Sequence, residues 1–276
     1  MLLCALAEGM KQTVKEPALA EVFGVVGSLA ACGAVMLPVA NCVVGVCRAA
    51  ESASVFMLSY VPVYAGVLAA TGQVTLALSY QTVVLFAAEL IAMLVIHVVL
   101  PLLTISLAFG VTGSVTSGVR LDGAGGLLNK SAVWLLGIVT TLFVGLLSLQ
   151  GIVGAAADTL GSKAVRLSLS SFVPVVGGAL SEAFGTVQGC LKLLKSTLGV
   201  FGIGATGLIV LPPLLQCAGW SICLSVCGMA AEMFELGPLA ALLKNAQGVV
   251  KTLIGVLASC ALFLIIATTI VTTAGG

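Results

Sequence analysis

Two ionisable side chains lie deep within one long apolar run of the sequence. Glu89 and His97 are eight residues apart, so on a helix they share one face, with Met93 between them. Ionisable groups inside membrane segments are costly and commonly belong to ion pathways or proton relays. The pair could therefore form a proton relay or a polar pore lining. The alternative is that each side chain satisfies a neighbouring group close to the kink expected at Pro101.

Two short apolar segments, 54–70 and 167–180, each contain a proline followed by glycine. A spanning helix needs roughly 20 residues, so both are short for a full crossing. Irregular backbone at membrane depth occurs only where it is buried in protein or lines a water-filled cavity. We therefore predict re-entrant segments or half-helices, with ordinary kinked helices packed through small residues as the alternative. The residues concerned are Pro62, Gly66, Pro174, Gly177 and Gly178, and further helix breaks are expected at Pro101, Pro212 and Pro213.

A more polar stretch, 181–199, follows the second of these segments. Its polar residues, including Lys192 and Lys195, fall mostly on one side of a helix, and Phe184 and Leu191 fall on the other. This pattern predicts an amphipathic helix at the membrane interface. A helix packed on a soluble partner is the alternative.

The sequence contains no group of residues with catalytic or metal-binding spacing. There are nine cysteines but no C-x-x-C pair, and there is a single histidine, so the spacing of a zinc site is missing. No nucleophile–base pair, carboxylate dyad or ATP-binding loop stands out. We expect no metal, no cofactor and no enzymatic activity, and we interpret the cysteines as packing residues.

The composition excludes an ordinary soluble protein. Of the 276 residues, 60% are hydrophobic and 8% are charged, whereas soluble domains carry roughly 25% charged residues. In lipid only helices and closed barrels can satisfy their backbone, and the long apolar runs favour helices over short alternating strands. We predict an all-α, polytopic membrane protein forming a single membrane domain, 1–276. The net charge of +1 gives no reason to expect a nucleic-acid partner.

The order of segments repeats along the chain. SYVPVYAGVL at 59–68 matches SFVPVVGGAL at 171–180 in six of ten positions, and VVLPLL at 98–103 resembles IVLPPL at 209–214. These matches predict an internal duplication with a period of about 112 residues. The repeat units would be 20–131 and 132–245, with a closing helix at 246–273. Phe201 and Ile209 stand at the positions of Glu89 and His97 in the second unit, so that pair is not part of the shared design.

The stretch LSLSSFVPVVGGALSEAFGTVQGCLKLLKSTLGVFGIGATG, 167–207, resembles the stage III sporulation protein AE family, and so does IVLPPLLQ at 209–216. The resemblance implies a membrane subunit of the channel complex that links the mother cell to the forespore, located in the mother-cell membrane around the forespore. It also implies partners among the other proteins of that complex, including a secretion-type ATPase, ring-forming proteins and the forespore-side stage II protein Q. A homo-oligomer in the lipid bilayer is expected.

Two functions remain open from the sequence. The first is a conduit or assembly platform in the sporulation channel. The second is a permease resembling secondary transporters, with a substrate site at the midplane between the duplicated halves. Family members usually carry a signal and an extra region before the membrane domain. This chain begins close to its first spanning run, so we expect a membrane core, either truncated or a short homologue.

Overall fold

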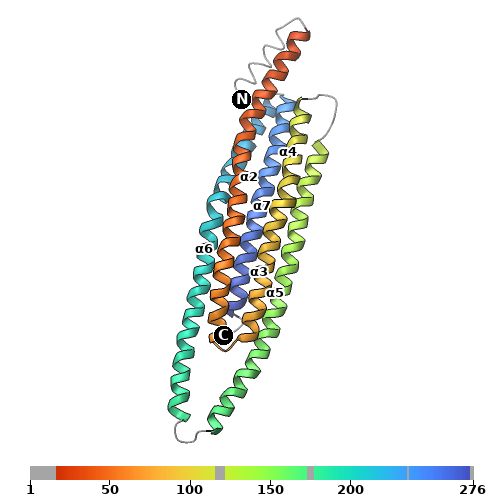
Figure 1. The fold of residues 1–276 in the computed structure, drawn as a ribbon. Coiled ribbons are helices and arrows are strands. Elements are labelled where there is room, and N and C mark those ends of the chain that lie inside the picture. The colour runs from red at the N-terminus through yellow and green to blue at the C-terminus, as the bar shows by residue number, and fades with distance from the viewer. Residues whose placement is uncertain (1–16, 116–121, 173–176, 235, 274–276) are drawn as a thin grey trace. The chain divides into compact units, whose positions relative to one another are not determined.

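The computed structural model describes residues 17–115, 122–172, 177–234 and 236–273, and these residues are helical with short connections and no strand. The prediction of an all-α protein is confirmed. Figure 1 shows the helices in chain order from red to blue. They are α2 (Pro17–Ala70), α3 (Val74–Leu94), the π-helical turn η1 (Val95–Val99), α4 (Leu100–Val115), α5 (Asp122–Phe172), α6 (Gly177–Met233) and α7 (Gly237–Thr273).

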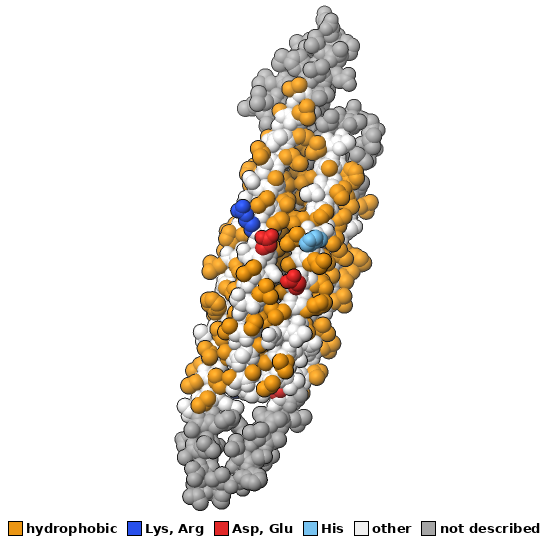
Figure 2. All heavy atoms as spheres, viewed as in Figure 1, with side chains coloured by type: hydrophobic (Ala, Val, Ile, Leu, Met, Phe, Trp, Pro, Cys, Tyr) orange, Lys and Arg blue, Asp and Glu red, His pale blue; other side chains and the backbone are white. Residues whose placement is uncertain are grey.

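Among the described residues, five helical segments are long and apolar enough to cross a membrane. The face seen in Figure 2 is largely hydrophobic, with only a few charged side chains within it. Because water would not solvate such a surface, these are the properties of a multi-pass membrane protein. The five segments are Leu29–Ala70, Val74–Thr112, Gly126–Gly154, Gly185–Met233 and Leu239–Ile270.

The helices continue through most of the prolines that were expected to break them. Pro62 lies inside α2, and Pro212 and Pro213 lie inside α6. An internal proline removes one backbone hydrogen bond, whereas a helix end leaves about four groups without an intrahelical partner. In apolar surroundings, continuing the helix through a proline therefore costs less free energy than ending the helix there. The predicted breaks at Pro212 and Pro213 are wrong, and residues 54–70 are the last part of α2 rather than a separate half-helix.

The second Pro/Gly segment lies at the start of α6. Gly177 and Gly178 are the first two residues of that helix, and Pro174 lies outside the described residues. A re-entrant form of this segment therefore stays a prediction.

Pro101 changes the helix locally without ending it. Residues 95–99 form a π-helical turn, and the Leu100 N–H bonds to the Val95 carbonyl. Proline has no N–H, and in a regular helix its ring would collide with the carbonyl four residues earlier, that of His97. The π turn, which is wider than an α-helical turn, lies directly before Leu100 and Pro101. The elements α3, η1 and α4 follow one another without a break.

The chain divides into two compact units, and each contains parts of several helices. The core of unit 1 includes Val39, Leu103, Leu136 and Leu253, all at most 1% exposed. The core of unit 2 includes Met57, Leu76 and Phe263, exposed to a similar degree. Unit 1 comprises 1–50, 93–137 and 211–258, and unit 2 comprises 51–92, 138–210 and 259–276.

Small residues and side-chain amides join the helices of unit 1. The Asn245 Nδ2 donates to the Ser106 carbonyl at 2.8 Å, which ties α7 to α4. Gly110, one turn further along α4, leaves the space that the Asn245 side chain occupies. The thiols of Cys42 and Cys217 share a hydrogen bond between α2 and α6. Close approach at small residues is the usual means of helix association in membranes.

In unit 2 a tight turn joins α2 to α3. The Gln73 N–H bonds to the Leu68 carbonyl at 3.1 Å, and the Gly72 N–H bonds to the Ala69 carbonyl at 3.0 Å. This pair of bonds is the Schellman motif, which requires a left-handed residue after the helix. Gly72 supplies it with φ of 87°, a conformation that glycine adopts without steric cost.

We predict that Gly110→Ala destabilises the protein by about 1–3 kcal/mol, because the added methyl group collides with Asn245 and displaces its bond to Ser106. Thermal unfolding of the detergent-purified chain measures the effect. The matched control is Gly33→Ala, where an added Cβ meets no atom within 4 Å and better helix propensity should raise stability slightly. Equal shifts for the two variants would show that the Gly110 contact does not matter.

Candidate functional site

The predicted intramembrane pair lies on exposed surface. Glu89 is exposed on α3 in unit 2, and His97 is exposed within η1 in unit 1. Met93 is 63% exposed, and the His97 Nδ1 lies 3.2 Å from the Met93 carbonyl oxygen. Neither ionisable group points into the core of its own unit. The proton relay and the pore lining both stay predictions, and any such role would involve this outer surface.

Lys195 is buried, although the amphipathic pattern placed it on a polar surface. Residues 181–199 are part of the long helix α6, not a separate interfacial helix. Lys192 is exposed, but Lys195 is only 4% exposed. Its Nζ donates to the Gln73 Oε1 at 3.3 Å, and no carboxylate of the described residues forms an ion pair with it. A buried ammonium with one neutral acceptor is costly, so it is a candidate functional group.

The Asp158 side chain caps the start of α3, although it lies more than eighty residues later in the sequence. Its two carboxylate oxygens accept the Thr75 N–H at 3.1 Å and the Leu76 N–H at 2.9 Å. The first N–H groups of a helix have no intrahelical partner, and a carboxylate there also favours the helix dipole. Leu76 packs so closely on α5 that a Cβ on Gly154 would lie 3.2 Å from its Cα. Asp158 therefore fixes α5 against the turn that carries Gln73.

Unit 2 also contains an aromatic stack that includes all three tyrosines of the chain. Ring centroids are 5.1 Å apart for Phe56 and Tyr60, 5.5 Å for Tyr60 and Tyr64, and 5.7 Å for Tyr64 and Tyr80. The Tyr60 hydroxyl donates to the Leu198 carbonyl at 2.9 Å. The stack thus links α2 to both α3 and α6.

The two other tyrosine hydroxyls are buried without a hydrogen-bond partner among the described residues. Tyr64 is fully buried and Tyr80 is 2% exposed. Each unmade bond costs about 1–3 kcal/mol. Gly199 and Gly202 of α6 leave the space beside Tyr64 and Tyr60, since a Cβ on Gly202 would overlap the Tyr60 ring. The interior of unit 2 therefore offers a buried amine and unpaired hydroxyls, groups that bind a polar or anionic species.

No metal centre is found in the described part of the chain: no group of three His, Cys, Asp or Glu side chains could hold an ion. The cysteines described there are free thiols.

From the sequence, Lys195 was predicted to lie on the polar side of an amphipathic helix, and Asp158 was not among the candidate site positions. Their partners could not be found, because Gln73 and Thr75 lie far away along the chain. The tyrosines gave one usable signal, the four-residue spacing of Tyr60 and Tyr64, which places two rings on one helix face.

Comparisons with known proteins agree with the family suggested by the sequence. The family described as "Stage III sporulation protein AE" matches residues 1–275. A curated relative, the stage III sporulation protein AE of Bacillus subtilis (strain 168), is 24% identical over 228 residues. That alignment covers 83% of this chain and 57% of the relative, so the chain spans little more than half of the relative's length. No solved structure matches the chain.

We predict opposite effects for two Tyr→Phe substitutions in unit 2. Tyr60→Phe should destabilise the protein by about 0.5–1.5 kcal/mol, because it removes the hydrogen bond to Leu198. Tyr64→Phe should leave stability unchanged or raise it, because its hydroxyl is buried and unpaired. Both changes keep the stacked ring, and thermal unfolding measures both. If Tyr64→Phe destabilises as much as Tyr60→Phe, the Tyr64 hydroxyl has a partner such as a bound water.

Proposed function

The chain belongs to the stage III sporulation protein AE family, and we propose that it is a multi-pass membrane subunit of the channel complex between mother cell and forespore. In this role it acts as a conduit or an assembly platform in the mother-cell membrane that surrounds the forespore. It carries out no catalysis of its own.

One observation carries the proposal: ionisable side chains are exposed in the central part of an apolar, membrane-length helix. Glu89 lies 15 residues after the start of the span Val74–Thr112, and His97 lies 15 residues before its end. A charged side chain facing lipid at the centre of a helix costs about 2.5–3.5 kcal/mol or more. Water or another protein surface beside each of these side chains would remove this cost, as in a subunit of a larger assembly.

The partners we propose are further copies of this chain and the other proteins of the channel complex, including its ATPase and ring-forming subunits. The order of helices supports the internal duplication that forms part of this proposal. In each proposed repeat a long helix, α2 or α5, precedes a second apolar helix with internal proline, α3–α4 or α6. The helix α7 then closes the chain.

We predict that Met93→Cys, between Glu89 and His97, reacts with a membrane-impermeant maleimide or cross-links between copies. The measurement uses the full chain in sporulating cells that make the rest of the complex. Labelling and cross-linking are compared with those of the unaltered chain, whose free cysteines, including the exposed Cys190 and Cys223, give the background. A water-filled conduit makes this thiol reactive, and a platform interface gives cross-linked species.

The control is Leu78→Cys on the same helix, because Met93 and Leu78 are both 63% exposed. Leu78 has no ionisable neighbour one turn away, so it should face lipid. A cysteine at this position should neither react with the maleimide nor cross-link.

Equal behaviour of the two cysteines would contradict the proposal. If both are unreactive and uncross-linked, the Met93 face is in lipid. If both react equally, exposure to water does not distinguish this face from the rest of the helix.

A permease is the second candidate, and the burial of Lys195 favours it. An ionisable group inside the protein, with a neutral partner and unpaired hydroxyls in the same unit, is a feature of ion-coupled transport. We predict that, if the chain is a permease, Lys195→Met abolishes proton flux in proteoliposomes and the exposed control Lys192→Met does not. The Met variant should fold at least as stably, because burying a charge without an ion-pair partner is costly and the apolar side chain removes that cost. Absence of flux with the unaltered chain would exclude this alternative.

A further inference from the structure

The thiols of Cys42 on α2 and Cys217 on α6 lie against each other in the interior of unit 1. Cys42 is 1% exposed, and Cys217 is fully buried. The two thiols share a hydrogen bond, so their sulfur atoms are neighbours across the two helices. Buried thiols commonly serve only as small packing groups, but two neighbouring sulfurs can also be joined covalently where the backbones are close enough.

The helices α2 and α6 approach closely at this level. Gly45 lies one turn from Cys42 on α2, and a Cβ on Gly45 would be 3.7 Å from the Pro213 Cβ on α6. Pro213 in turn lies one turn from Cys217. In disulfides the two Cβ atoms are about 3.5–4.5 Å apart. The separation of the two helices therefore meets the geometric requirement for a disulfide between Cys42 and Cys217.

A second pair of thiols lacks this geometry although its sulfurs are also neighbours. Cys223 and Cys227 share a hydrogen bond one turn apart on α6. On a single helix, Cβ atoms at this spacing are about 5–6 Å apart, which is too far for an unstrained disulfide. Cys223 is exposed, whereas Cys42 and Cys217 are buried. The two pairs therefore distinguish the effect of spacing from the effect of exposure.

The apolar surroundings favour a neutral product at the Cys42–Cys217 pair. A monovalent copper ion would bind both groups as thiolates and leave one net negative charge in the core of unit 1. An uncompensated buried charge is costly. A disulfide carries no charge, so its formation adds no such cost.

We propose that Cys42 and Cys217 are an oxidation site, at which an organic hydroperoxide dissolved in the membrane joins the two thiols as a disulfide. One sulfur attacks the terminal oxygen of the peroxide, which breaks the O–O bond, releases an alcohol and leaves a sulfenic acid. The second sulfur then displaces the hydroxyl group as water, and the S–S bond forms. The two sulfurs together lose two electrons, which reduce the peroxide, and the two thiol protons leave in the alcohol and the water.

The burial of the pair determines which oxidant suits it. Both sulfurs are covered by apolar helices of unit 1, so an oxidant that dissolves in apolar surroundings is required, and hydroperoxides of acyl chains are of this class. The disulfide closes a long loop of the chain, from residue 42 to residue 217, and stabilisation by a disulfide increases with loop length. Oxidation thus fixes α2 against α6 within unit 1. This site does not depend on the channel role.

The test is oxidation of the full chain, purified and placed in nanodiscs, by cumene hydroperoxide. The chain is then unfolded, and its free thiols are labelled with a maleimide and counted by mass spectrometry. The reduced chain has nine cysteines, and we expect two fewer labelled thiols after oxidation. Fragmentation of the linked peptides should identify Cys42 and Cys217 as the joined residues.

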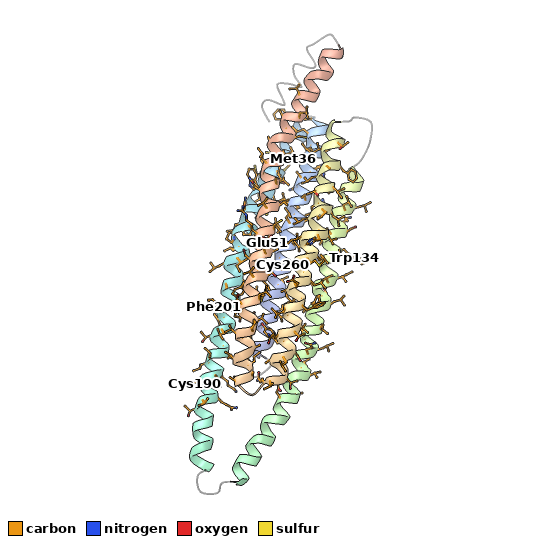
Figure 3. All side chains as sticks on the ribbon, viewed as in Figure 1. Met36, Glu51, Trp134, Cys190, Phe201 and Cys260 are labelled. Carbon is orange, nitrogen blue, oxygen red and sulfur yellow. The ribbon has the colours of Figure 1, made fainter. Side chains whose placement is uncertain are left out.

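Cys42→Ala is the test variant, and Cys260→Ala and Cys190→Ala are the controls. Cys260 is buried on α7 and Cys190 is exposed on α6, both in unit 2, and both are labelled in Figure 3. Oxidation should remove two thiols from each control and none from Cys42→Ala. It should also raise the midpoint of thermal unfolding of the controls by about 5–15 °C, with no rise for Cys42→Ala. If Cys42→Ala does not fold, the linked peptides of the unaltered chain decide.

Three results would overturn the proposal. An unchanged number of thiols would show that the pair is not joined by a hydroperoxide. A link between Cys223 and Cys227 in place of the expected one would show that exposure, not the spacing of the helices, determines the reaction. An equal loss of thiols from Cys42→Ala and the unaltered chain would show that other cysteines are the ones oxidised.

Discussion

Wherever the surface of the chain faces lipid, its backbone hydrogen bonds must be made within the chain. Only 8% of the residues are charged, so most of the surface has to face lipid. Each helix end leaves several carbonyl or N–H groups to be satisfied. The two ends of the α2–α3 connection show how this is met: a glycine-dependent turn serves the carbonyls of α2, and the Asp158 carboxylate serves the N–H groups of α3. The same constraint explains why α6 continues through Pro212 and Pro213.

Because apolar side chains gain little by leaving lipid for one another, packing within each unit depends on close fit and on polar contacts. Glycine beside a larger side chain recurs, with Gly110 facing Asn245 in unit 1 and Gly202 facing Tyr60 in unit 2. In both cases the larger side chain bonds to a backbone carbonyl of a neighbouring helix. The glycine provides the space, and the hydrogen bond determines which neighbour is paired.

The class of fold and the family could be predicted from the sequence, because composition and long apolar runs are local properties that lipid imposes everywhere. Segment boundaries were predicted less well. Residues 54–70 looked too short to span, but Arg48 and Glu51, three residues apart, interrupt the apolar run without ending the helix. The Asp158 cap and the bond from Lys195 to Gln73 each join residues far apart along the chain, so no local pattern contained them.

Two sets of polar side chains differ in their exposure, and the difference bears on the function of the chain. Inside unit 2, Lys195 and the tyrosines are buried by the chain's own helices, so no other protein is needed to cover them. Glu89 and His97 are instead exposed on helices that are otherwise suited to lipid. A chain that worked alone would turn these costly groups inward, as it does with Lys195. Their outward position is therefore better explained by a neighbour in the membrane, or by water enclosed between neighbours, than by a self-contained transport site.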